Sequence, residues 1–247
     1  MPDYAHDNIV PYKDSGLSKK LQVAGMFNDI AFRYDFLNRF LSAGIDVRWR
    51  KKAIRQLAQK KPKTLLDVAT GTADVAIMAS GILHPDKITG IDISDGMLDM
   101  GRKKIQKLGL QDTIELLNGD CETINSDDNS FEAVTVAFGV RNFENLEKGL
   151  AEMLRVLKPS GKVVILEFSK PKSAIIRSLY SFYSSKICPW LGNMISKDPV
   201  AHTYLNKSVE AFPEGENFAT ILKRTGYKEV GIRPLTFGVA TIYTGTK

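Results

Sequence analysis

Long apolar runs, a signal-like leader and a cysteine framework are all missing from this chain of 247 residues. The longest apolar stretch, residues 133–140, is far too short to cross a bilayer. Residues 1–16 are polar and lack the apolar centre of a secretory signal. The two cysteines, Cys121 and Cys188, show no metal-type spacing. We therefore expect a cytoplasmic protein without a metal site, whose only membrane contact is peripheral, at the inner face of the membrane.

Strong charge of one sign is also lacking. The chain has 34 Lys and Arg against 28 Asp and Glu, a net charge of +6. Basic residues are scattered, and the densest run, residues 48–52, falls inside a helical pattern, so no nucleic-acid partner is indicated. The excess of positive charge contributes either to solubility or to a weak attraction to anionic surfaces. Hydrophobic residues at 43% and charged residues at 25% exclude a disordered, collagen-like or coiled-coil chain.

Two kinds of periodicity divide the chain. Residues 1–60 are expected to form an irregular arm and a helical cap, because apolar residues recur there at three- and four-residue spacing. Asp46 is placed to cap the second of these helices. Residues 61–247 alternate short apolar runs with helical stretches. This rhythm predicts an α/β domain with a doubly wound, mostly parallel seven-stranded sheet.

Small and acidic residues gather where the predicted strands end. The first strand runs into a turn that contains Asp67 and Gly71, and the second strand ends at Asp92, roughly twenty residues on. A carboxylate at that second position accepts hydrogen bonds from both hydroxyls of a ribose. Asp120 and Cys121 follow the third strand, where a carboxylate and a backbone amide can bracket an adenine. Together these residues predict an adenosine cofactor.

The identity of the cofactor follows from what the turn after the first strand contains. Of a dinucleotide fingerprint only Gly71 is present, and the Gly-Lys pair of a phosphate-binding loop is absent. Asp67 and Asp74 oppose a pyrophosphate and suit a cationic ligand. S-adenosylmethionine, which carries a sulfonium and an ammonium group, fits this charge. A tight strand–helix turn without any ligand is the alternative.

Several segments carry a resemblance to a known family. They are residues 34–49, which begin Tyr-Asp-Phe-Leu-Asn-Arg, residues 138–143 (Phe-Gly-Val-Arg-Asn-Phe), residues 155–169 and residues 234–240. Together they resemble the ubiquinone/menaquinone biosynthesis C-methyltransferase family, which belongs to the class I S-adenosylmethionine-dependent methyltransferases. The resemblance extends from about residue 25 to the C-terminus.

This resemblance places cofactor contacts at Thr72, Asp92, Asp120 and Cys121. The family usually has His where this chain has Asp46, and a second Gly where it has Ser160. The change at Asp46 argues against an obligatory base at that position, and helix capping accounts for the aspartate.

The resemblance implies C-methylation of a polyprenylated quinol in respiratory quinone biosynthesis, with demethylmenaquinol as the first expectation. The alternatives are a benzoquinol of ubiquinone biosynthesis, another small apolar acceptor such as a sterol or fatty acyl chain, a cofactor-binding module without catalysis, or an RNA-binding relative. A module without catalysis should lack at least one of the cofactor-binding residues, yet Asp67, Gly71, Asp92 and Asp120 are all present. An RNA-binding relative would carry an appended basic domain.

Candidate catalytic and acceptor-site residues complete the prediction. Arg141 follows the fourth strand and is expected to stabilise a phenolate while a water takes the proton; a structural salt bridge is the alternative. His202 is the only histidine placed to act as a base. Tyr34, Asn142 and Tyr204 are candidates for the acceptor pocket, with core packing the alternative for the tyrosines and helix capping for Asn142.

An aromatic interruption at residues 170–212 is expected to form a helical lid over the strand ends, together with the helices of residues 19–60. Its aromatic side chains predict a tunnel or membrane-facing patch for an isoprenoid tail, or else packing on the core. Those side chains are Tyr180, Phe182, Tyr183 and Trp190, together with the apolar Leu191. Tail length, proton acceptor and oligomeric state stay open.

Overall fold

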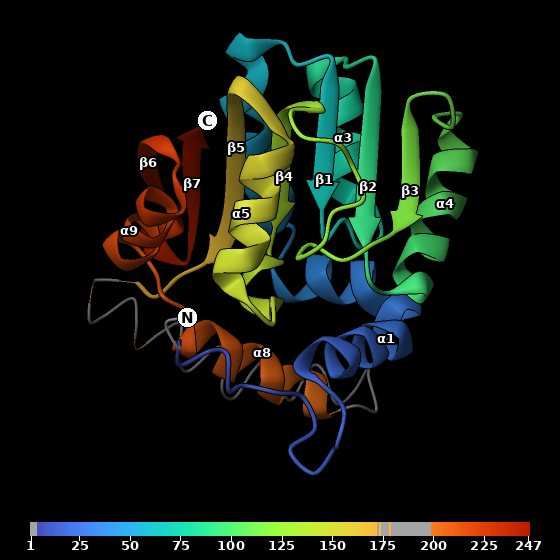
Figure 1. Ribbon diagram of the computed structural model, residues 1–247. Coiled ribbons are helices and arrows are strands. Elements are labelled where there is room, and N and C mark those ends of the chain that lie inside the picture. Colours follow the sequence, from blue (N-terminus) through green and yellow to red (C-terminus); the bar gives the residue numbers. More distant parts are fainter. Residues whose placement is uncertain (1–3, 172, 174–177, 179–198) are drawn as a thin grey trace.

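A single twisted sheet organises the computed structural model, which describes residues 4–171, 173, 178 and 199–247 (Figure 1). The strand order is β3-β2-β1-β4-β5-β7-β6. All pairings from β3 to β5 are parallel, whereas β7 runs antiparallel to both β5 and β6. The predicted α/β, doubly wound, seven-stranded sheet is therefore confirmed. The strands are β1 (Thr64–Val68), β2 (Lys87–Asp92), β3 (Ile114–Asn118), β4 (Phe131–Ala137), β5 (Leu157–Phe168), β6 (Lys228–Leu235) and β7 (Ala240–Thr246).

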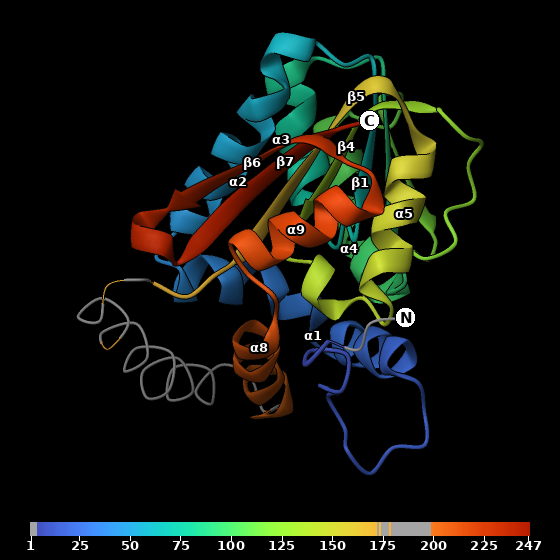
Figure 2. The same ribbon diagram turned by 60° about the vertical axis from the view of Figure 1, so that its left-hand side comes forward.

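Helices cover both faces of the sheet and one of its ends (Figures 1 and 2). Strand order reverses between β1 and β4, so the crevice of a doubly wound fold opens at their carboxyl ends. Figure 1 shows α1 and α8 lying across this end, below the arrowheads of β1 and β2. The helices are α1 (Lys19–Leu41), α2 (Ile45–Ile54), α3 (Asp74–Leu83), α4 (Asp95–Leu108), α5 (Leu146–Val156), α8 (Pro199–Ala211) and α9 (Glu216–Thr225).

The core consists of two apolar layers, one on each face of the sheet. Successive strand residues point to opposite faces. Leu65 accordingly packs into one layer and Leu66 into the other, and neither is exposed. Because both faces are covered, β1 reads as a continuous apolar run rather than an alternating one.

The entry into α2 differs from the prediction. Gly44, with φ +73°, is the residue before the helix, and its left-handed backbone turns the chain into α2 two residues earlier than expected. Asp46 therefore lies inside the first turn, where its carboxylate accepts a hydrogen bond from Ser42 Oγ at 2.7 Å and pairs with Arg50. The capping role predicted for Asp46 is wrong. The helix also ends at Ile54, and residues Arg55–Lys60 continue as a 3₁₀ helix.

Within the described ranges, no helix combines the length and apolar character needed to span a bilayer.

Candidate active site

A cavity opens where the carboxyl ends of β1, β2 and β4 meet the inner face of α1. Its walls are largely apolar, with Val23, Phe27 and Tyr34 contributed by α1. The loops at the strand ends supply the polar part. Of the predicted site residues, the cavity is lined by Gly71, Asp92, Asp120, Cys121, Tyr34 and Asn142.

The turn between β1 and α3 brings its backbone to the edge of this cavity. Ala69, Gly71 and Ala73 all adopt left-handed backbone, with φ of +50°, +56° and +64°. The space beside Gly71 is open, since a Cβ added to it would meet no atom within 4 Å. Gly139 in the loop after β4 approaches the same turn so closely that a Cβ there would lie 2.7 Å from Ala69 Cβ. The two loops leave backbone, not side chains, facing the cavity at these points.

Asp92 at the end of β2 is held rigidly. One carboxylate oxygen accepts the Gly71 N–H at 2.8 Å and the other accepts the Ser94 N–H at 2.9 Å. Of the roughly four acceptor positions of a carboxylate, these two and a further backbone contact with Ile93 use up to three, and the rest face donors from the cavity. Burial raises the pKa of Asp92 despite these backbone hydrogen bonds. A pair of hydroxyl donors, as a ribose presents, is what this buried carboxylate fits.

Asp120 and Cys121 follow β3, in the loop whose Gly119 N–H donates to the Asp92 carbonyl at 3.0 Å, and lie next to Lys20 in the N-terminal turn of α1. Asp120 accepts the Glu122 N–H at 2.9 Å and forms an ion pair with Lys20, which also lies 3.5 Å from Glu122. Burial, followed by the charge of Asp120, raises the pKa of the Cys121 thiol well above its ordinary value, so the thiol stays neutral. Lys20, which the sequence did not single out, thus neutralises the acids next to the expected adenine position.

Asp67 and Thr72 are buried behind this cavity rather than on its wall. The Asp67 carboxylate accepts hydroxyl hydrogen bonds from Thr70 at 2.6 Å and Thr135 at 2.7 Å, and burial raises its pKa to about 6. It fastens β1 to its own turn and to β4. Thr72 donates its hydroxyl to Asp35 at 2.5 Å. The geometry gives both residues a supporting position and does not support the direct cofactor contact predicted for them.

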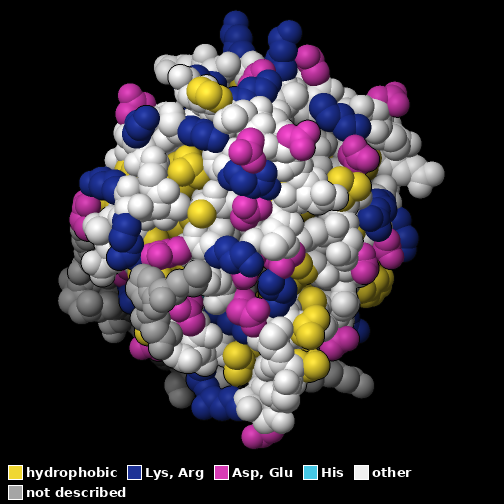
Figure 3. Space-filling model, in the orientation of Figure 1, with side chains coloured by type: hydrophobic (Ala, Val, Ile, Leu, Met, Phe, Trp, Pro, Cys, Tyr) yellow, Lys and Arg dark blue, Asp and Glu magenta, His cyan; other side chains and the backbone are white. Residues whose placement is uncertain are grey.

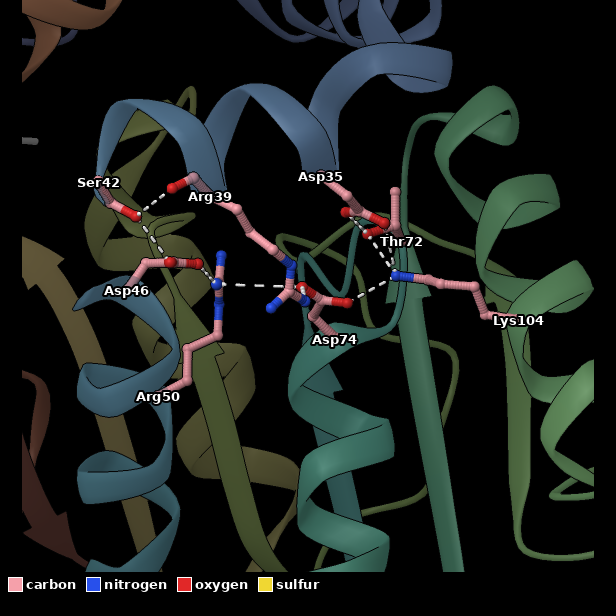
Figure 4. A network of polar contacts seen from close by, with 8 residues as sticks. All are labelled: Asp35, Arg39, Ser42, Asp46, Arg50, Thr72, Asp74 and Lys104. Atoms are coloured by element: carbon pink, nitrogen blue, oxygen red, sulfur yellow. Dashed lines mark hydrogen bonds and ion pairs between the residues drawn. The ribbon is translucent and has the colours of Figure 1, made fainter. Parts of the chain in front are cut away.

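A network of charged groups joins α1 to the turn after β1 (Figure 4). The Lys104 ammonium donates to Asp35 at 2.8 Å, Asp74 at 2.6 Å and Thr72 at 3.0 Å. Arg39 donates to the other Asp74 oxygen at 3.1 Å, and Arg50 lies 4.0 Å from it.

The same network determines the charge state of Asp74 in the turn after β1. Burial favours a raised pKa for Asp74, but Lys104, Arg50 and Arg39 more than offset it and lower the value. The negative charge of Asp74 is therefore balanced by the chain's own cations. The sequence suggested that Asp74 attracts a cationic ligand, but its charge is already neutralised by Lys104, Arg39 and Arg50.

We expect Lys104→Met to lower the free energy of unfolding by about 1–2 kcal/mol, because Asp35 and Asp74 lose a shared, partly buried partner. Urea unfolding measures the change. Lys103→Met is the matched control, since Lys103 is exposed on the same helix and should change stability by less than about 0.5 kcal/mol. Equal loss in the two variants would show that the network contributes nothing to stability.

Arg141 and Glu167 form a buried ion pair on the other side of the cavity. Arg141 Nη1 donates to Glu167 Oε1 at 2.7 Å and to the Phe138 carbonyl at 2.6 Å. The guanidinium lies over the Phe168 ring, 5.4 Å from its centroid. Burial raises the pKa of Glu167, although Arg141 opposes the shift. The structural salt bridge weighed for Arg141 is thus present, and its buried Nε has no hydrogen-bond partner within the described residues.

Asn142 connects this ion pair to α8. Its side-chain oxygen accepts the hydroxyl of Tyr204 at 3.1 Å, and Tyr204 packs with Val23 and Met26 of α1. Burial raises the pKa of the Tyr204 hydroxyl, so it acts here as a donor rather than a base. Tyr34 faces the cavity and meets Phe27 edge-on at 5.9 Å. Tyr34 and Asn142 line the cavity, whereas Tyr204 lies outside its lining and is linked to it through Asn142.

Two predictions fall outside the described part of the chain. His202 belongs to α8 by its backbone, but its side chain is not among the described residues. The aromatic side chains at 180, 182, 183 and 190 and the side chain of Leu191 are also outside it, so of the lid expected at 170–212 only α8 is described. Glu167 is a functional candidate that was not predicted from the sequence. An acidic residue near the end of the fifth strand is the same pattern that identified Asp92 at the end of the second.

Solved structures place this architecture in a known class. A SAM-dependent methyltransferase from Aquifex aeolicus matches with a TM-score of 0.55 at 20% identity, over 78% of this chain and 88% of that one. The [4+2]-cyclase SpnF matches with a TM-score of 0.61 at 15% identity, over 92% and 96%. The fold is that of the class I S-adenosylmethionine-dependent methyltransferases. SpnF shows that the fold alone does not fix the reaction.

Sequence comparison narrows the class to a family. Residues 15–247 match the model of the ubiE/COQ5 methyltransferase family, and the chain belongs to that family. A demethylmenaquinone methyltransferase of Bacteroides fragilis is 46% identical over 99% of this chain and 100% of its own length. A ubiquinone/menaquinone biosynthesis C-methyltransferase UbiE of Geobacter sulfurreducens is 44% identical over 92% and 88%. The resemblance stated from the motifs is confirmed, and the chain is an S-adenosylmethionine-dependent methyltransferase.

Proposed function

We propose that this methyltransferase transfers a methyl group to a ring carbon of demethylmenaquinol. The observation that carries the choice of acceptor is the full-length relationship to demethylmenaquinone methyltransferases, at 46% identity in Bacteroides fragilis and 43% in Porphyromonas gingivalis. The apolar cavity with polar groups at both ends supports it, because a quinol combines an apolar ring and tail with two hydroxyls.

The cavity presents the groups that S-adenosylmethionine would need at the strand ends, namely Asp92, Asp120 and Cys121. When bound, S-adenosylmethionine supplies an electrophilic methyl group on its sulfonium. Asp92 would hold the ribose hydroxyls with the acceptor capacity that its backbone donors leave free. Asp120 and the Cys121 N–H take the adenine edge, with Lys20 sharing the Asp120 carboxylate.

The acceptor must be ionised for its carbon to react. Loss of a phenolic proton to water places electron density on the ortho carbon, which would form the new bond to the methyl group as the methyl–sulfonium bond breaks and leaves a neutral thioether. The proton displaced from that carbon then leaves and restores the aromatic ring. Arg141 stabilises the phenolate electrostatically, while Asn142 and Tyr204 orient the ring beside it. Holding the two reactants together and excluding water supplies much of the rate.

The reduced acceptor should be methylated and the oxidised one should not, because only the quinol has a phenolic proton to lose. Incubating the enzyme with S-adenosylmethionine and demethylmenaquinol under dithionite, then with the quinone under strictly non-reducing conditions, measures the difference by chromatography of the methylated product. Equal rates on the two forms would refute the phenolate mechanism.

A benzoquinol is the second acceptor to include. Relatives at 44% identity are named for both ubiquinone and menaquinone biosynthesis, so the assay should offer a tailed benzoquinol beside the naphthoquinol. A benzoquinol methylated faster than the naphthoquinol would overturn the choice of acceptor and leave the reaction class intact. Either acceptor is a membrane lipid, so the enzyme collects it at a membrane surface.

A further inference from the structure

Helix α1 is apolar on two opposite faces. Its inner face buries Val23, Met26 and Leu37. Its outer face leaves Phe32 80% exposed, Phe36 57% and Phe40 45%. Four-residue spacing sets these three rings one above the other along about 12 Å of helix. A helix that is apolar on both faces has a second apolar partner besides its own core.

Polar contacts prevent α1 from rolling to bury this stripe. Asp35 and Arg39, on the same stretch of helix, are held by Lys104 and Asp74 (Figure 4). The rings of Phe36 and Phe40 stack, with centroids 5.7 Å apart and planes at 11°. The stripe is therefore a fixed, pre-arranged surface rather than a set of loose side chains.

Basic residues outnumber acidic ones in α1 and α2, although Lys20, Arg39 and Arg50 are paired with acids and Asp29 is exposed on α1. Residues 19–54, which make up α1 and α2, contain eight basic residues against three acidic ones, and so carry most of the chain's excess of positive charge. Arg33 is exposed next to Phe32. In Figure 3, hydrophobic side chains reach the surface beside basic ones in the lower half of the molecule, at the level of α1. Exposed aromatic residues combined with basic ones suit the interface of an anionic bilayer.

The stripe also has a defined position relative to the active site. Val23, Phe27 and Tyr34 on the inner side of α1 line the cavity. The outer stripe is therefore only about one helix diameter, 10–12 Å, from the acceptor site. A bilayer on this face would hold a lipid acceptor next to the cavity, whereas the face has no comparable use for an acceptor free in water.

We propose that the outer face of α1, formed by Phe32, Phe36, Phe40 and Arg33, is the surface by which this enzyme docks on an anionic lipid bilayer. The proposal rests on the proposed function, because the membrane-borne acceptor gives the docking its purpose. It moves the expected membrane contact from the aromatic interruption at 170–212 to the first helix.

Vesicle binding tests the surface directly. The full chain is sedimented with vesicles of 70% phosphatidylcholine and 30% phosphatidylglycerol, and with phosphatidylcholine alone. We expect the double variant Phe32→Gln/Phe36→Gln to bind the anionic vesicles at least tenfold more weakly than the wild type. Arg33→Glu should lose affinity for the anionic vesicles only.

The matched control is Leu108→Gln. Leu108 is 56% exposed but lies at the end of α4, near the amino ends of the strands and away from α1. It should bind vesicles like the wild type. Calorimetry with S-adenosylmethionine confirms that each variant keeps a folded cofactor site. A loss in Leu108→Gln equal to that in the double variant would overturn the proposal.

Two acceptors separate docking from chemistry. With a short-tailed, water-soluble quinol the double variant should keep wild-type turnover, whereas with a long-tailed quinol in anionic vesicles its rate should fall. Vesicle binding that depends on the stripe supports docking even if no quinol is methylated, which would refute only the proposed function. Wild-type vesicle binding by the double variant overturns docking. Docking is also overturned if the double variant binds vesicles like the wild type but changes from dimer to monomer in ultracentrifugation. That result would assign the stripe to self-association.

Discussion

Replacing Asp92 with alanine is expected to weaken S-adenosylmethionine binding by at least tenfold in a chain that stays folded. Two charge-assisted hydrogen bonds to the ribose are lost, each contributing roughly 1.5–3 kcal/mol. The Gly71 and Ser94 N–H groups also lose their common acceptor, so the turn beside the cofactor is less well fixed. Isothermal titration calorimetry gives the affinity, and circular dichroism reports the fold.

Asp99→Ala is the control for this substitution. Asp99 lies on α4, just after the Asp92 loop, but its side chain is 63% exposed and its partner is Arg102. It should leave the affinity within twofold of wild type. Unchanged affinity in a folded Asp92→Ala variant would remove Asp92 from the cofactor site, whatever the fate of the other contacts.

The residues at the strand ends were predictable because they depend on local order in the chain. A carboxylate that ends a parallel strand must lie at the crevice once the sheet forms, so Asp92 and Asp120 follow from strand assignment alone. Asp67 is different, because its place behind the turn depends on the hydroxyls of Thr70 and Thr135, and the second of these comes from another strand.

Partners distant in the sequence were not predictable. Asp74 looked like a ligand for a cation because Lys104 and Arg39, which neutralise it, come from two other helices. For Arg141 a salt bridge was foreseen as an alternative, but nothing near it in the sequence named Glu167.

The exposure of Phe32, Phe36 and Phe40 on the outer face of α1 could not be predicted for another reason. Apolar periodicity shows that a helix has an apolar face, yet a helix with two such faces leaves open which one the protein buries. The periodicity rested on residues such as Phe27 and Leu37, which do face inward or line the cavity. Phe32, Phe36 and Phe40 form a second series four residues apart, which only the packing of α1 identifies as exposed.

Arg141→Lys should lower turnover by about a hundredfold while S-adenosylmethionine affinity stays near the wild-type value, in line with the loss of one well-placed donor to a developing oxyanion. Lysine keeps the charge, but its single ammonium cannot reproduce the planar guanidinium, which leaves Nε and Nη2 as further donors while Nη1 donates to both Glu167 and the Phe138 carbonyl. Single-turnover rates at saturating cofactor, on reduced acceptor, measure the effect. A collapse of cofactor affinity with normal turnover at saturation would instead place Arg141 in the cofactor site.

A purely structural ion pair makes a different prediction, and the pH profile separates the two. If Arg141 stabilises the phenolate, the rate of Arg141→Lys should recover as pH rises, because a higher pH supplies the phenolate that the guanidinium no longer favours. Glu167→Gln keeps an acceptor for Arg141 Nη1 but removes the neutralising charge, so it should shift the same profile to lower pH. If the pair only supports the fold, both variants should melt at lower temperature and keep the wild-type pH profile. Opposite shifts from the two members of one ion pair require that the guanidinium, through its charge and its donor geometry, acts on the reacting acceptor.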